Sequence, residues 1–148
     1  MKITDPMILR QIIMDHYQYP RNKRVCEDDH CKTVHMATES CIDDIQVQAV
    51  IENNLIKDIC FDGIACTIST ASTSILTELM KGKTVTEVKE LISLYRQMID
   101  LQEIDPEPLE EAVAFINVGK QANRIKCATI GWDALDQIIQ ESEDEDDK

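Results

Sequence analysis

Apolar positions in the first segment of the chain recur at helical spacing. They predict an amphipathic helix over Asp5–Tyr17, which Pro20 ends and which packs one face against a sheet. The positions on that face are Ile8, Leu9, Ile12, Ile13 and Tyr17.

Strict alternation of apolar and polar residues follows in the middle of the chain. It runs from Asp44 to Glu52 and again from Leu55 to Phe61, which is typical of half-buried strands. Asn53-Asn54 between them is typical of a hairpin turn, so the two strands are expected to be antiparallel. Gly63 is expected to end the second strand.

Helical spacing dominates from Cys66 onwards. A first helix is expected to end at Gly82, and Thr84 to Glu87 has the spacing of a capping box that begins the next. Further helices are expected from Asp105-Pro106 to Gly119 and from about residue 123 to 140. The sequence thus predicts one α+β domain over residues 1–140, with a small antiparallel sheet of about three strands packed against an N-terminal helix and several C-terminal helices.

Two segments lack such patterns. Residues 21–39 are charged and aperiodic and are expected to form a mobile loop, and residues 141–148 are expected to form a disordered acidic tail. The net charge is −13, and residues 1–140 alone hold 22 acids against 14 bases. Such a surface repels phosphates, so neither nucleic acid nor a membrane is expected as a partner.

Six cysteines occur in a chain that begins without an apolar run long enough for export or for a membrane span. We therefore expect a cytoplasmic protein with reduced thiols, in which cysteines serve metal or sulfur chemistry before disulfides. At 148 residues the chain can build a core without disulfides.

Three cysteines lie at expected element boundaries. Cys41 precedes a strand, Cys66 stands where a strand passes into a helix, and Cys127 lies near the start of the last helix. Helix N-termini stabilise thiolates, and Asp43 could add an oxygen ligand on the same side as Cys41. Buried structural cysteines remain the alternative, because the spacings match no zinc-finger pattern.

Other candidates have simpler explanations. Cys26, His30, Cys31 and His35 form either a second metal site or part of a solvated loop. Cys60 is expected to pack beneath the surface, and His16 to pack or form a hydrogen bond at the end of the first helix. The serines and threonines from Thr67 to Thr77 suggest a closely packed helix face, since they lack a phosphate-loop pattern.

Three segments resemble the NifU/IscU/SufU family of iron–sulfur cluster assembly proteins. They are residues 12–22 (IIMDHYQYPRN), 61–69 (FDGIACTIS) and 124–129 (RIKCAT), and they span nearly the whole chain. About twenty extra residues between Cys66 and Cys127, and Lys126 in place of a histidine, are similar to the SufU branch.

The resemblance implies the family's fold and its ligands. Cys41, Asp43, Cys66 and Cys127 match the residues that hold zinc in SufU-type proteins and a nascent [2Fe–2S] cluster, and hence iron, in IscU-type scaffolds. Arg124 matches an arginine near that site. Ile42 departs from the family's glycine, which takes a positive φ that isoleucine cannot take without strain.

By this resemblance the chain accepts persulfide sulfur from a SufS-like cysteine desulfurase, as a zinc-dependent relay, and supports cluster delivery to apo-proteins or carriers. It is not a stand-alone enzyme, and at most a sulfurtransferase acting with the desulfurase. Cys127 is the expected acceptor, exposed and supported by Arg124 and Lys126.

Two other functions stay open: a scaffold on which a [2Fe–2S] cluster is built, and an interaction module with a purely structural zinc. A DnaK-type chaperone is not expected as a partner. The proline-valine motif that such chaperones recognise is absent, because Gln121-Ala122-Asn123 stands in its place.

Overall fold

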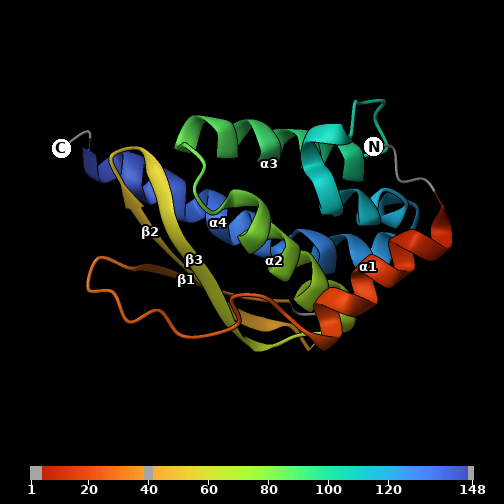
Figure 1. The fold of residues 1–148 in the computed structure, drawn as a ribbon, viewed down its shortest axis with the longest axis horizontal. Coiled ribbons are helices and arrows are strands. Elements are labelled where there is room, and N and C mark those ends of the chain that lie inside the picture. Colours follow the sequence, from red (N-terminus) through yellow and green to blue (C-terminus); the bar gives the residue numbers. More distant parts are fainter. Residues whose placement is uncertain (1–4, 39–41, 147–148) are drawn as a thin grey trace.

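The computed structural model describes residues 5–38 and 42–146 (Figure 1). In chain order the regular elements are α1 (Pro6–Gln18), β1 (Lys32–Ala37), β2 (Asp44–Glu52), β3 (Leu55–Ile64), α2 (Thr67–Met80), α3 (Val85–Ile99), the 3-10 turns η1 (Glu107–Phe115), η2 (Val118–Lys120) and η3 (Ala122–Arg124), and α4 (Ile125–Asp146).

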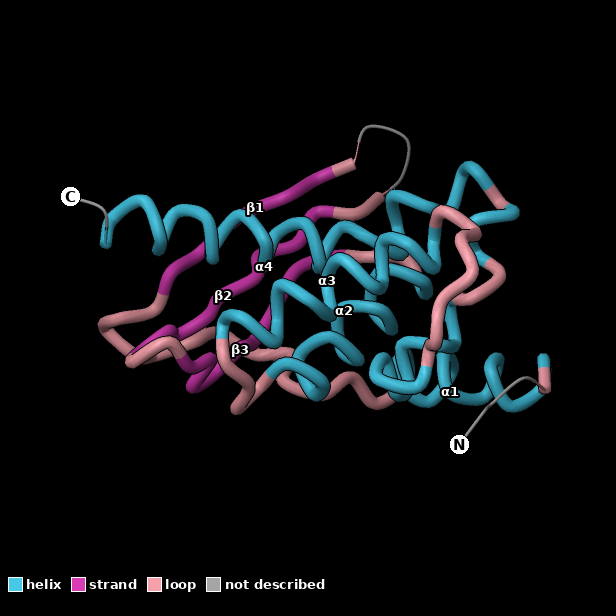
Figure 2. Tube along the Cα trace, turned by 90° about the horizontal axis from the view of Figure 1, so that it is seen from above, coloured by secondary structure: helices cyan, strands magenta, loops and turns pink. Residues whose placement is uncertain are grey.

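The three strands form one antiparallel sheet in the order β1-β2-β3. Helices cover one face of this sheet, as the view from above shows (Figure 2). Helix α4 packs against β1 and β2, while α2 packs against β3, α1 and α4. This arrangement confirms the predicted α+β fold with a three-stranded sheet.

The β2–β3 hairpin brings its two open ends together. Asn53 and Asn54 take the positive φ angles of 53° and 63° that a tight two-residue turn requires. At the other end of the hairpin, Asp44 is paired with Ile64. Consequently Asp43, which precedes β2, lies beside Ala65 and Cys66, which follow β3.

Gly63 lies inside β3 and does not end it, contrary to the prediction. Its φ is +123°, and a Cβ at this position would stand 2.2 Å from the backbone oxygen of Asp44. Only glycine allows the strand to continue so close to its neighbour.

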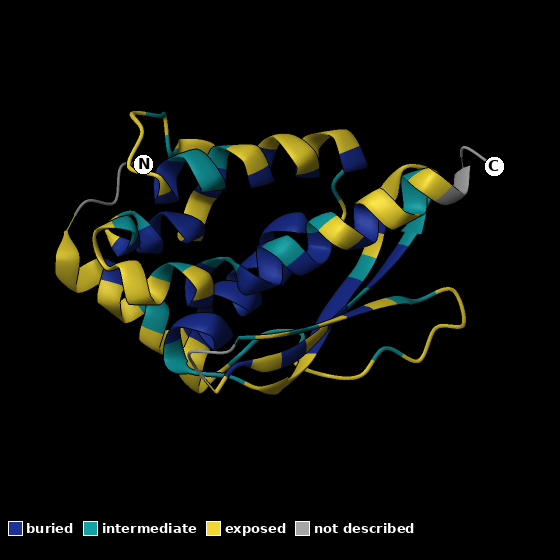
Figure 3. Cartoon of the chain, turned by 180° about the vertical axis from the view of Figure 1, so that it is seen from behind, coloured by how far each residue is buried: buried dark blue, intermediate teal, exposed yellow. Residues whose placement is uncertain are grey.

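The helix starts agree with the prediction. Cys66 is the N-cap of α2, and Thr84 forms a capping box with Glu87 at the start of α3. Gly82 ends the preceding turn with a φ of +87°. Helix α2 is buried on nearly every side (Figure 3), which confirms the predicted packed face of serines and threonines.

Polar groups tie α2, α3 and α4 together inside the core. The hydroxyls of Ser72 and Tyr95 donate to the backbone oxygen of Ala128 at 2.6 and 2.7 Å, and Trp132 Nε1 donates to Ser72 Oγ at 3.0 Å. The rings of Tyr95 and Trp132 stack with centroids 3.7 Å apart. The first turn of α4 is thereby fixed against α2.

Three predicted boundaries differ from the structure. Part of the expected loop, Lys32–Ala37, forms the edge strand β1, in which one residue, Val34, is fully buried and gives little hydrophobic signal. The expected helix up to Gly119 is a series of 3-10 turns, interrupted at Glu110 by a φ of 50°. Helix α4 continues to Asp146 where a disordered tail was expected, and Lys89 of α3 forms an ion pair with Glu143 on this extension.

No helix in residues 5–38 or 42–146 combines the length and the apolar character needed to cross a bilayer.

Candidate metal centre

Asp43, Cys66 and Cys127 converge at the open end of the hairpin. One ligand atom from each lies within 4.8 Å of the others, and no other group of three such residues in the described part of the chain does this. Asp43 immediately precedes β2, Cys66 stands between β3 and α2, and Cys127 is the third residue of α4. We call these three residues the Asp43 site.

Asp43 is buried and held by hydrogen bonds. It is 1% exposed, its Oδ1 accepts from the backbone N–H of Cys66 at 2.8 Å, and its Oδ2 accepts from the hydroxyl of Ser69. Burial alone would raise the pKa of this carboxyl, but the hydrogen bonds from Ser69 and Cys66 outweigh it and hold the pKa below its ordinary value. Asp43 is therefore an ionised carboxylate inside the protein, and its oxygens could serve as metal ligands.

Cys66 is half-buried, and its thiol caps helix α2. Its Sγ accepts from the backbone N–H of Ser69 at 3.5 Å and lies 3.9 Å from Asp43 Oδ2. The sulfur thus faces the positive end of the helix dipole.

Cys127 stands in the first turn of α4 but is only 6% exposed, so the expectation of an exposed thiol is wrong. Burial, together with hydrogen-bonding contacts to Cys66 and Asp43, raises the pKa of its thiol far above the ordinary value. Lys126 and Arg124 are exposed beside it, as predicted.

The donor set suits a borderline or soft metal ion. Two sulfurs and one carboxylate oxygen are ligands that zinc and iron accept, and three protein ligands leave at least one position of a tetrahedral ion open. A bound cation would also oppose the burial that, with the contacts to Cys66 and Asp43, raises the pKa of the Cys127 thiol. The residues present therefore fit the implied metal.

The expected fourth ligand, Cys41, lies outside the described residues. Ile42, which replaces the family's glycine, is 65% exposed and is not among the residues with positive φ in the described part of the chain. Isoleucine at this position therefore leaves Asp43 inside the site.

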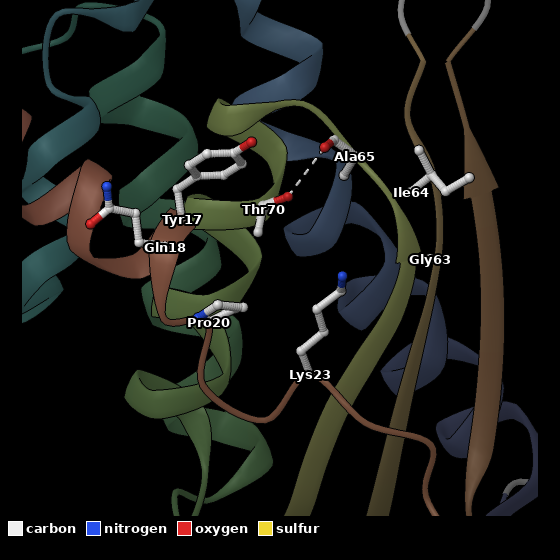
Figure 4. A pocket seen from close by; sticks show the side chains of 8 residues that line it. All are labelled: Tyr17, Gln18, Pro20, Lys23, Gly63, Ile64, Ala65 and Thr70. Carbon is white, nitrogen blue, oxygen red and sulfur yellow. Dashed lines mark hydrogen bonds between the residues drawn. The ribbon is translucent and has the colours of Figure 1, made fainter.

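An open pocket of about 490 Å³ lies next to Cys66 (Figure 4). It lies between the end of α1 and the β3–α2 junction, where Tyr17, Lys23 and Ile64 line it. Thr70 donates a hydrogen bond to the backbone oxygen of Ala65 at its edge. The pocket leaves free volume directly beside the turn that carries Cys66.

The other predicted candidates do not join this site. His35 forms an ion pair with Asp44, away from His30, so the set Cys26, His30, Cys31 and His35 is not one metal site. His16 is 1% exposed and hydrogen-bonds Ser74 Oγ at 2.8 Å, and Cys60 is fully buried, as expected for both.

Sequence reasoning missed Ser69, whose hydroxyl orients Asp43 from within α2. Its place three residues after Cys66, in the first turn of a helix, was the available signal.

Comparisons with known proteins identify a family for this chain. The family model described as NifU-like N terminal domain matches residues 8–146. The Bacillus subtilis protein named zinc-dependent sulfurtransferase SufU is 35% identical over 92% of both chains. A Streptococcus pyogenes protein named iron-sulfur cluster assembly scaffold protein IscU is 33% identical, over 88% of this chain and 82% of that one.

Solved structures lead to the same family. A protein from Fervidobacterium islandicum, described as an iron-sulfur cluster assembly scaffold for the SUF system, superposes with a TM-score of 0.81 at 28% identity, over 90% of this chain and 97% of that one.

Proposed function

This chain belongs to the NifU-like N-terminal domain family of iron–sulfur cluster assembly proteins, and from that premise we propose that it accepts persulfide sulfur from a cysteine desulfurase and supports cluster assembly. The observation that carries the proposal is the meeting of a buried, ionised Asp43 with two thiols at two helix N-termini.

Asp43, Cys66 and Cys127 would hold a zinc ion, with Cys41 as the expected fourth ligand. Bound zinc keeps its thiolates ionised at neutral pH and protects them from oxidation.

The transfer itself balances without an added oxidant. An acceptor thiolate of this chain attacks the outer sulfur of the desulfurase persulfide. A new S–S bond forms on the acceptor, the S–S bond of the donor breaks, and the desulfurase cysteine leaves as a thiolate. Exposed lysine or arginine beside the acceptor stabilises the negative charge that moves with the sulfur.

Cys127 is the proposed acceptor, with Lys126 and Arg124 as its exposed cationic neighbours. Its low exposure means that the attack requires the first turn of α4 to open, since the thiol now lies against Cys66 and Asp43. Cys66, which is less buried, is the competing acceptor.

The test is to label the sulfur. The desulfurase is supplied with cysteine carrying radioactive sulfur, and peptides of this chain are mapped without reductant. We expect label on Cys127, and Cys127→Ser should abolish stimulation of the desulfurase while the fold is retained by circular dichroism. Label that stays on Cys66 or Cys41 in Cys127→Ser would refute the assignment of Cys127 as the acceptor but would still support sulfur transfer to this chain.

A scaffold for a [2Fe–2S] cluster is the second candidate, and the hard oxygen of Asp43 beside two thiols favours it. Anaerobic reconstitution with iron and sulfide separates the two functions. A stable cluster that apo-proteins take up supports the scaffold, whereas zinc that iron cannot displace supports the relay. An unexchangeable zinc without any stimulation of a desulfurase would leave only a structural module.

A further inference from the structure

Cys60 lies on the face of the sheet that the helices leave uncovered. It is paired with Gln48 of β2, and both alternate along their strands with core residues such as Val47 and Phe61. Cys60 is nevertheless 0% exposed. Another part of the chain must therefore cover it.

The cover is the segment between α1 and β1, drawn in orange in Figure 1. It is fixed first beside β3, where Phe61 N donates to Asn22 O at 3.0 Å and Arg24 N donates to Phe61 O at 2.9 Å. It then crosses to β2, where Cys26 N donates to Gln48 Oε1 at 2.8 Å. The same Gln48 oxygen accepts from Cys60 Sγ at 3.7 Å, so one side chain holds two cysteines together.

Cys31 completes the group just before β1. Its thiol lies 4.0 Å from the backbone oxygen of Lys32, and Cys26 is near enough to influence the thiols of both Cys31 and Cys60. Burial, followed by the contact with Cys26, raises the pKa of Cys31 to about 12, and burial raises the pKa of Cys60 to about 11. We call Cys26, Cys31 and Cys60 the outer-face cysteines.

We propose that the outer-face cysteines are a second site for a thiophilic d10 cation, separate from the Asp43 site. Cys26 and Cys31 are the outer ligands, and Cys60 is the inner one. A site whose charged ligands are thiolates selects copper(I) or zinc over magnesium and calcium.

The surroundings meet the needs of such a site. Gln48 orients two ligands and is itself fixed by a hydrogen bond from its Nε2 to Thr33 Oγ1 at 3.1 Å. Burial raises the pKa of the Cys60 thiol, and the charge of Arg24, which is held by both oxygens of Asp58 at 2.7 and 2.8 Å, lowers it in part. Cys31 also lines an open pocket of about 490 Å³ with His30 and Glu52, which gives a cation an entry path.

Cation binding requires a local closure. The three sulfurs do not all lie within 4.8 Å of one another, since only the Asp43 site meets that spacing in the described residues. Residues 25–31 contain no helix or strand, so Cys31 can approach Cys60 without breaking the sheet. Binding should therefore order this segment and protect it from proteases.

Cadmium titration of the reduced full chain under anaerobic conditions tests the proposal, with thiolate-to-cadmium charge-transfer absorption as the readout. We expect two equivalents for the unmodified chain and one for Cys66→Ser/Cys127→Ser, in which the Asp43 site is removed. Adding Cys26→Ser to that double variant should weaken the remaining equivalent by more than about 100-fold. Glu27→Gln, at an exposed position of the same segment, is the matched control and should leave it intact.

Three results would overturn the proposal. They are a single equivalent in the unmodified chain, a second equivalent that persists after Cys26→Ser and Cys31→Ser, or thiol counting that finds Cys26 joined to Cys31 in a disulfide in the purified chain. Competition with chromogenic chelators then distinguishes copper(I) from zinc, and failure of both cations to bind would also reject the site. None of these outcomes depends on a desulfurase, so the sulfur relay is tested separately.

Discussion

Asp43, Cys66 and Cys127 stand at the ends of three regular elements, whereas Cys26 and Cys31 stand on an irregular segment that is bonded to the sheet at a few points. Both groups crowd thiols whose pKa is raised by burial and by one another. In the Asp43 site the β2–β3 register and two helix starts fix the spacing before any ligand arrives. In the outer-face group, the spacing of the three thiols depends on whether a cation binds. The Asp43 site is thus preorganised, whereas the outer-face cysteines would be brought together by their ligand.

Gly63→Ala should have the largest effect, because it disturbs the preorganised Asp43 site. Its Cβ would meet the Asp44 oxygen at 2.2 Å in a backbone conformation that L-residues rarely adopt, so the end of β2 beside Asp43 must shift. We expect a loss of at least about 2 kcal/mol in the free energy of unfolding, measured in urea, together with weaker zinc binding.

Gly82→Ala is the matched control, because Gly82 also has a positive φ but nothing within 4 Å of the added methyl group. It should cost about 1 kcal/mol and leave zinc binding unchanged. Equal losses in the two variants would show that the close approach at Gly63 does not position the site.

Ser69→Ala should lower zinc affinity at the Asp43 site by about 10- to 100-fold, because the hydroxyl orients the Asp43 carboxylate. Competition with a chromogenic chelator measures the change. Ser93→Ala, at an exposed position of α3, is the control and should have no effect. Cadmium binding by the outer-face cysteines should also be unchanged, and a parallel loss there would mean that the two groups are not independent.

These expectations also show how far the sequence could lead. The hairpin and the caps at Cys66 and Thr84 followed from local periodicity and capping residues, whereas the grouping of Asp43, Cys66 and Cys127 followed from the family resemblance. The edge strand β1 could not be predicted, because the sequence of an edge strand with one buried side chain differs little from that of a charged loop.

The meeting of Cys26 with Cys60 could not be predicted for a different reason. It depends on a crossing segment fixed by backbone bonds to Phe61 and by the side chain of Gln48. Such contacts join residues more than twenty positions apart and leave no period in the sequence. The burial of Cys127 was missed in the same way, since it results from packing against residues far away in the chain.

Cys60→Ala should give a smaller, pH-dependent effect that tests whether the outer-face thiols are neutral in the metal-free protein. The folded-state pKa of Cys60 is raised from 9.0 to about 11, so its stabilising contribution is complete below pH 9 and is lost as the pH rises towards 11. The free energy of unfolding, measured with reductant and chelator, should therefore fall less steeply between pH 9 and 11 in the variant. Identical slopes would contradict a protonated, buried Cys60.

Lys126→Glu should produce the smallest effect, a decrease of about three-fold in desulfurase stimulation that high salt reduces, because an exposed charge acts mainly on the encounter between partners. Zinc content should stay the same. Lys57→Glu makes the same charge change near the hairpin turn, at the far end of β3, and should leave the stimulation unchanged. Equal losses in both variants would assign the effect to net charge alone.

The stack of Trp132 on Tyr95 makes the chain's single tryptophan an optical reporter. Both side chains are fully buried, and both are tied through hydrogen bonds to the backbone oxygen of Ala128 or to Ser72, next to Cys127. Two aromatic rings in such contact couple their electronic transitions, which gives a strong near-ultraviolet circular dichroism band and tyrosine-to-tryptophan energy transfer. A movement of the first turn of α4 would change both signals, so loading and opening of the site can be followed in real time without attaching a dye.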